Sequence, residues 1–135
     1  MACWLLKTEP STYSFVDLTR DRRTTWDGVS NAQALIHLRA MKAGDEVLVY
    51  HTGGDKAIVG LAKIAAGPRA DPRLDDPRMV VVDVEAVRAL TAPLSLADIK
   101  RDGALAGLDL VRNSRLSCMP VSPAHRARLR ILGVK

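Results

Sequence analysis

Apolar and polar side chains alternate along several short segments of the chain, which is the pattern of strands that bury one face. The clearest is 79–87, where Val80, Val82 and Val84 share one face while Asp83 and Glu85 share the other. The same alternation places Trp4 on the core side of the first such segment. Together these patterns predict about five strands, over 3–8, 46–52, 57–64, 79–87 and 117–121.

Short helices are predicted where a serine can cap a helix N-terminus. In three places an Asp or Gln follows the serine by three residues, as in a capping box, and in a fourth a proline takes the first helical position. The four predicted caps are Ser14, Ser30, Ser95 and Ser122. The corresponding helices are expected over 15–20, 31–43, 96–101 and 123–132.

The predicted strands and helices interleave without a strict βαβ order, and no internal repeat or linker separates them. Residues 27–28 are predicted to turn, and 68–77, rich in Pro, Asp and Arg, to form a loop. We therefore predict one α+β domain over 1–135, built on a small, mixed or mainly antiparallel β-barrel. The sequence has no dinucleotide-binding fingerprint, phosphate-binding loop or nucleophile elbow.

The composition favours a partner with negative charge. The formal net charge is +5, which is typical of proteins that contact nucleic acid. No apolar run approaches the roughly 20 residues that a membrane helix needs, and no signal peptide is evident, so we expect a cytoplasmic protein without membrane contact. The two cysteines and three histidines are too dispersed for a disulfide framework or a metal site. We expect no cofactor.

Four segments taken together resemble the EVE domain family. They are WLLKTEPSTYS at 4–14, WDGVSNAQA at 26–34, MVVVDV at 79–84 and LVRNSRLSCMPV at 110–121. The resemblance covers nearly the whole chain. It implies a PUA-like fold, a small mixed β-barrel of about five strands with flanking short helices. It also implies a reader of modified bases, chiefly modified cytosine in DNA, whereas the related YTH domains read methylated adenine in RNA.

A base reader needs an aromatic surface for stacking and polar groups that pair with the base edge. Trp26 is the predicted stacking residue because it lies outside any apolar run, in a predicted loop; a core anchor is the alternative. Asn31 is predicted to pair with the base edge, since an amide both donates and accepts. The alternative for Asn31 is helix capping.

Further pocket residues follow from the resemblance. Lys7 and Thr8 end the first predicted strand, where a barrel opens, and Lys7 breaks an otherwise apolar segment. Ser114 and Ser117, in the fourth motif, are implied to contact the base edge.

Three arginines are predicted to bind phosphate. Arg115 lies in the fourth motif, and Arg22 and Arg23 belong to a basic cluster. Arg115 could instead pair with Asp27 or Asp83, and the basic cluster could be a solvated surface.

The chain also departs from the family. Ala32 and Met79 stand where members commonly have aromatic residues, and Ser30 stands where they have arginine. We therefore expect an incomplete aromatic cage, weak binding and modest discrimination between modified and plain bases.

The function predicted is a non-catalytic, monomeric reader of a modified base in DNA or RNA. A nuclease or restriction protein encoded separately is a candidate partner, because bacterial EVE domains are often linked to such systems. One alternative is a small amidohydrolase of the ASCH type that uses Lys7, Thr8 and Glu9, although neighbouring strand residues face opposite sides. The other is a module that binds a small molecule or a protein.

Overall fold

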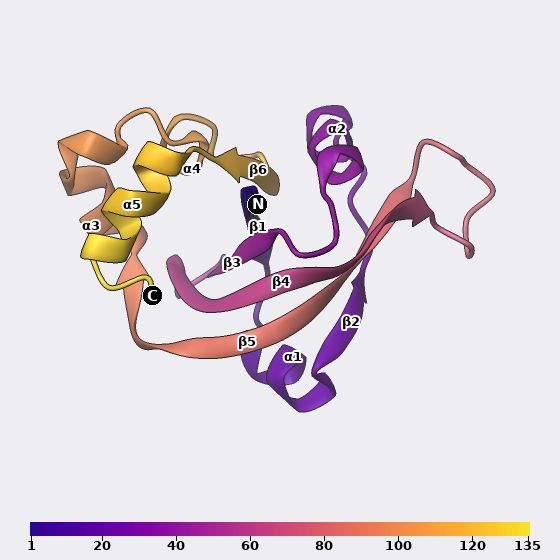
Figure 1. The fold of residues 1–135 in the computed structure, drawn as a ribbon, viewed down its shortest axis with the longest axis horizontal. Helices are drawn as coiled ribbons and strands as arrows, with labels where there is room; N and C mark the ends of the chain where they lie inside the picture. Colours follow the sequence, from indigo (N-terminus) through magenta and orange to yellow (C-terminus); the bar gives the residue numbers. More distant parts are fainter.

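A six-stranded mixed sheet organises the fold in the computed structural model, which describes all 135 residues (Figure 1). The strands are β1 (Cys3–Thr8), β2 (Arg23–Trp26), β3 (Glu46–His51), β4 (Ala57–Ala70), β5 (Val80–Ser95) and β6 (Cys118–Val121). Their order is β2-β5-β4-β3-β1-β6. Only β1 and β3 run parallel, and the other neighbours are antiparallel. The α+β class with a mixed sheet is confirmed.

The sheet has six strands where about five were predicted, and it stays open, so it differs from a barrel in not being closed. Strands β2 and β6 form its two edges and do not pair with each other. The additional strand is β2, which the sequence pattern left in a loop. Both edge strands have only four residues, which limits the unpaired backbone that an open sheet exposes.

Six helices surround the sheet: α1 (Phe15–Asp21), α2 (Ala32–Ala40), α3 (Leu96–Arg101), the 3₁₀ turn η1 (Gly103–Leu105), α4 (Asp109–Arg112) and α5 (Pro123–Ile131). The capping roles of Ser14, Ser95 and Ser122 are confirmed. The predicted cap Ser30 is wrong, because Asn31 caps α2 instead. The sequence pattern did not predict η1 or α4. In Figure 1, α3, α4 and α5 gather at one end of the sheet, apart from α2.

A long, bent hairpin of β4 and β5 spans the molecule (Figure 1). Strand β4 continues to Ala70, into the segment that was predicted as a loop. Its Pro68 lies where the β4–β5 register shifts, between Ala66 and Arg69. Such a bulge accommodates a residue that cannot donate to the ladder.

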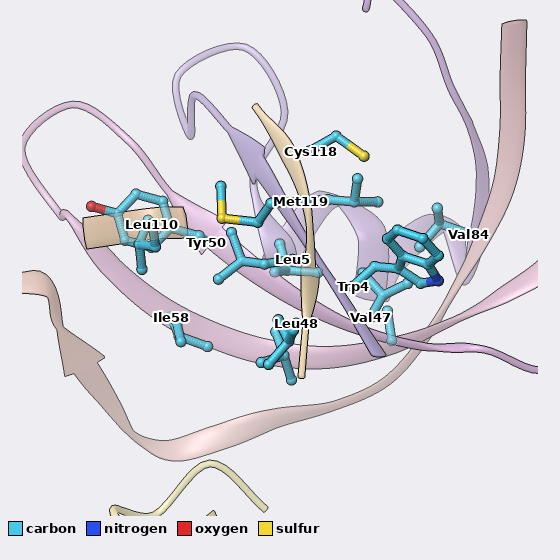
Figure 2. Packing of buried hydrophobic residues seen from close by; sticks show 14 of the residues in the cluster. Trp4, Leu5, Val47, Leu48, Tyr50, Ile58, Val84, Leu110, Cys118 and Met119 are labelled. Carbon is cyan, nitrogen blue, oxygen red and sulfur yellow. The ribbon is translucent and has the colours of Figure 1, made fainter. Parts of the chain in front are cut away.

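The core lies between the sheet and the helices, and its side chains come from all six strands and from the helices that cover them; Figure 2 shows part of this packing, including Leu110 of α4. Trp4 is 7% exposed, and its indole Nε1 donates to Asp45 at 2.9 Å, which confirms its predicted place in the core. Both cysteines are free thiols, and burial raises the pKa of Cys118 to about 12. No helix has the length and apolar character needed to cross a bilayer.

Gly60 lets α1 pack closely on β4. A Cβ atom at this position would overlap the ring of Phe15, which is itself buried. We expect Gly60→Ala to lower the free energy of unfolding by about 1–3 kcal/mol, as overpacking does. Urea denaturation measures this change. The matched control is Gly54→Ala, where a Cβ would meet no atom; equal effects of the two substitutions would contradict the packing role.

Candidate functional site

A pocket of about 510 Å³ opens between the two edges of the sheet. Ligand sites typically have volumes of about 300–1,000 Å³. Its walls come from the end of β1, the segment before α1, strand β2, the β2–α2 loop and the residue before β6. They comprise Lys7, Thr8, Thr12, Tyr13, Thr24, Thr25, Trp26, Asp27, Gly28, Val29, Ser30, Asn31 and Ser117. One cavity therefore joins the β2 edge of the sheet to the end of β1 and to the residue before β6.

Two aromatic side chains line this pocket. Trp26 is the last residue of β2, not part of a loop as predicted, and it is 8% exposed. It belongs both to the core cluster and to the pocket wall, so the two roles considered for it coexist. Tyr13 meets it edge to face, with ring centroids 6.5 Å apart. Only a small part of Trp26 is accessible from the pocket. Tyr13 adds a second aromatic surface to the wall, which the sequence did not indicate.

Asn31 combines a structural contact with a free polar group. Its Oδ1 accepts a hydrogen bond from the Ala34 amide at 3.0 Å, which caps α2. Its Nδ2 donates to no group of the protein, and the residue is exposed at the pocket. The helix cap fixes the orientation of the amide and leaves two N–H donors for a ligand.

Lys7 and Thr8 reach the pocket from the end of β1, as the sequence predicted. The Lys7 ammonium donates to the Ser114 carbonyl at 2.8 Å and lies 5.7 Å from the centre of the Tyr50 ring. Burial lowers the pKa of Lys7. The Thr8 hydroxyl donates to the Tyr13 carbonyl at 2.6 Å. These contacts order the pocket wall before any ligand enters.

The two serines of the fourth motif differ in position. Ser117 lines the pocket, and its carbonyl accepts from the Lys7 amide at 2.9 Å. Ser114 is exposed and does not line the pocket, and its carbonyl accepts a hydrogen bond from the Lys7 ammonium. The structure therefore does not place Ser114 in the pocket wall, and its contact with a base stays a prediction.

An ion pair ties the pocket rim to the β4–β5 loop. Arg73 contacts Asp27, which lines the pocket, and Asp71, whose side chain is only 3% exposed. Hydrogen bonds from Arg73 lower the pKa of the Asp71 carboxyl. This link connects two loops that are more than 40 residues apart in the chain.

The three predicted phosphate-binding arginines occupy different places. Arg23 forms an ion pair with Asp83 at 3.2 Å. Arg22 lies outside the pocket and lines a separate hollow beside Ala86–Ala89. Arg115 is exposed and pairs with neither Asp27 nor Asp83, so that alternative is wrong.

The three residue types of the hydrolase alternative do not converge on the pocket. Glu9 accepts hydrogen bonds from Ser11 at 3.0 Å and from Thr52 at 3.2 Å, and it is not part of the pocket wall. Lys7 and Thr8 therefore face the cavity without a carboxylate from this motif.

The sequence model of the EVE domain matches residues 2–131. This chain belongs to the EVE domain family. Thymocyte nuclear protein 1 of mouse is 33% identical over 88% of this chain and 68% of its own length. The resemblance drawn from the four motifs is thus confirmed.

Solved structures match this EVE domain closely. A protein from Rhodopseudomonas palustris is 35% identical, with a TM-score of 0.93 over 98% of this chain and 93% of its own. Human THYN1 protein in complex with 5-methylcytosine-containing DNA is 30% identical, with a TM-score of 0.90 over 100% and 99% of the two chains. An ASCH protein from Zymomonas mobilis, 9% identical with a TM-score of 0.62 over 99% and 97% of the two chains, shares only the fold.

Proposed function

We propose that this EVE domain is a non-catalytic reader that holds a modified cytosine of DNA in the pocket between β2 and the β1–β6 edge. The observation that carries the proposal is the convergence of aromatic rings, an exposed amide and an ammonium group on one cavity. The bound 5-methylcytosine-containing DNA of human THYN1, whose chain aligns over the full length of this one, supports the choice of ligand.

The base must leave the double helix to enter such a pocket, and partners for its face and its edge replace the lost stacking and pairing. Trp26 and Tyr13 supply the aromatic surfaces that contact the face of the base. The free amide of Asn31 and the remaining protons of Lys7 supply donors for the ring nitrogen and carbonyl of cytosine. Hydroxyl groups of Thr and Ser in the wall supply acceptors for the exocyclic amine.

The methyl group itself adds little affinity. Val29, which is partly buried against the core, offers apolar surface within the wall. Burying one methyl contributes about 0.8 kcal/mol, which corresponds to roughly fourfold in affinity. We therefore propose a modest preference for 5-methylcytosine over cytosine.

Asn31→Asp separates base recognition from helix capping. Aspartate caps a helix as well as asparagine does, so the melting temperature should stay nearly unchanged. The donor Nδ2 is lost, and the new carboxylate repels the base carbonyl. We expect affinity for a 5-methylcytosine oligonucleotide to fall about tenfold or more, measured by titration of tryptophan fluorescence with single- and double-stranded DNA.

The matched control is Gln33→Glu, which makes the same charge change on an exposed residue of the same helix, outside the pocket wall. If both substitutions weaken binding equally, the loss comes from charge alone and the edge-pairing role of Asn31 is wrong. Equal affinity of the wild type for modified and plain DNA would overturn the reader function itself.

A further inference from the structure

Two arginines flank one carboxylate directly beside the pocket. Asp83 of β5 accepts from Arg23 at 3.2 Å through one oxygen and from Arg69 at 3.0 Å through the other. The Thr25 hydroxyl donates to Asp83 at 2.9 Å, and Thr25 also lines the pocket. This cluster, which we call the arginine clamp, thus shares a residue with the proposed base site.

The register of the sheet builds the arginine clamp. Thr25 lies opposite Asp83 across the β2–β5 pair, and Arg23 precedes it by two residues, on the same face. Arg69 of β4 lies opposite Val81, two residues before Asp83. The two arginines therefore approach the carboxylate from the two strands that border β5.

Burial and charge distinguish the arginine clamp from ordinary surface ion pairs. The Asp83 side chain is 16% exposed, whereas those of Arg23 and Arg69 are 51% and 43% exposed. Burial opposes ionisation of Asp83, but the hydrogen bonds from Arg69, Thr25 and Arg23 outweigh it and lower its pKa. The carboxylate stays charged beneath two guanidinium groups, and the three side chains together carry one net positive charge.

Most donors of the two guanidinium groups remain free. Each group has five N–H donors in a planar fork. In Arg23 one guanidinium nitrogen donates to Asp83, and in Arg69 one nitrogen donates to both Asp83 and Thr25. Two exposed forks that are already held in place match the geometry of a phosphate, which arginine binds through paired hydrogen bonds.

We propose that the arginine clamp binds a phosphate of the DNA backbone next to the base that occupies the pocket. This inference rests on the proposed function, because the base site fixes which phosphate comes near Thr25. The arginine clamp would hold the backbone in the distorted form that exposes the base, while the pocket reads the base.

Substituting the arginines tests the clamp. We expect Arg69→Gln and Arg23→Gln each to lower affinity for a 5-methylcytosine oligonucleotide about tenfold at low salt. Because both bind one phosphate, the double variant should lose less than the product of the two single losses. For the double variant, the slope of log affinity against log salt concentration should become shallower than that of the wild type by about 0.9, as expected for the loss of one phosphate contact. The control is Arg130→Gln, an equal charge change on an exposed residue of α5 that is not part of the pocket wall.

A neutral backbone linkage provides a second, independent readout. A methylphosphonate replaces each phosphate near the 5-methylcytosine in turn. At one position it should weaken the wild type and leave the double variant unaffected. Two results would overturn the clamp. One is a loss of affinity in the arginine variants no larger than that in Arg130→Gln. The other is a methylphosphonate scan in which every position that weakens the wild type weakens the double variant as well.

The free nucleoside 5-methyl-2′-deoxycytidine, which has no phosphate, separates the two proposals. Its binding should be equal in the wild type and in the double variant. If the nucleoside binds but the arginine variants behave like the control, the base reader stands and the clamp is wrong. If the wild type neither binds the nucleoside nor prefers modified DNA, the proposed function fails, while the salt slopes on plain DNA still decide whether the arginine clamp holds phosphate.

Discussion

Trp26→Ala should weaken base binding and also destabilise the fold, because the indole belongs to the pocket wall and to the core. Removing a buried tryptophan lowers the free energy of unfolding by about 3–5 kcal/mol. Loss of stacking lowers affinity by about 1–3 kcal/mol per base, or roughly 5- to 150-fold. Circular dichroism on heating measures the first effect, and titration with a 5-methylcytosine oligonucleotide below the lowered melting temperature measures the second.

Two further variants separate these effects. Trp26→Phe keeps an aromatic face and should retain most of the affinity and most of the stability. Trp4→Phe removes an indole that is equally buried and that donates to Asp45, but that does not line the pocket. It should destabilise the protein without changing the affinity of the folded state. If folded Trp26→Ala binds the modified base as well as the wild type, Trp26 is only a core residue.

The starts of the helices could be predicted from sequence because capping is local. Ser14 accepts from the Asp17 amide and Asp17 accepts in return, so a single tetrapeptide holds the whole signal. The prediction failed for α2, where Ser30 and Asn31 are adjacent. Both are good caps, and the sequence gives no means to choose between them.

The strands whose pairing is distant were predicted less well. Strand β2 has four residues, and its register is fixed by Val82–Glu85, 56 to 62 residues away along the chain. The bulges that carry β4 past Pro68 likewise depend on its partner strand. A sheet edge and a bulge are decided by tertiary pairing, which local alternation does not reveal.

The pocket could be predicted in part. Lys7, Thr8, Trp26, Asn31 and Ser117, chosen from three separate motifs, line one cavity, although their contact with a base remains a prediction. Tyr13 and Thr25 also line the cavity, but the sequence carried no signal for them. Arg69, which contacts Thr25 beside the pocket, lay in the loop predicted over 68–77. Thr25 and Arg69 meet because β5 pairs with both β2 and β4.

Glu46→Ala should be among the most destabilising substitutions on the side of the sheet where α5 packs. Arg126 donates to both Glu46 oxygens, at 2.6 and 3.0 Å, and to the Val134 carbonyl at 2.7 Å, and only 7% of Arg126 is exposed. The pair therefore joins β3 to α5 and the C-terminal segment. Removing one partner leaves a buried charge uncompensated, at a cost of about 3–5 kcal/mol. Replacing both, as in Glu46→Leu with Arg126→Met, should recover much of this loss.

The same pair makes stability depend on pH. The hydrogen bond from Arg126 outweighs desolvation and lowers the pKa of Glu46 in the folded protein. Its contribution is therefore complete above the unfolded pKa of about 4.3 and is lost as the pH falls through the lower folded value. Glu46→Gln cannot titrate, so its deficit relative to the wild type should be large at neutral pH and small in acid. Urea unfolding at both pH values measures the two deficits, and equal deficits would show that the charge of Glu46 does not stabilise the fold.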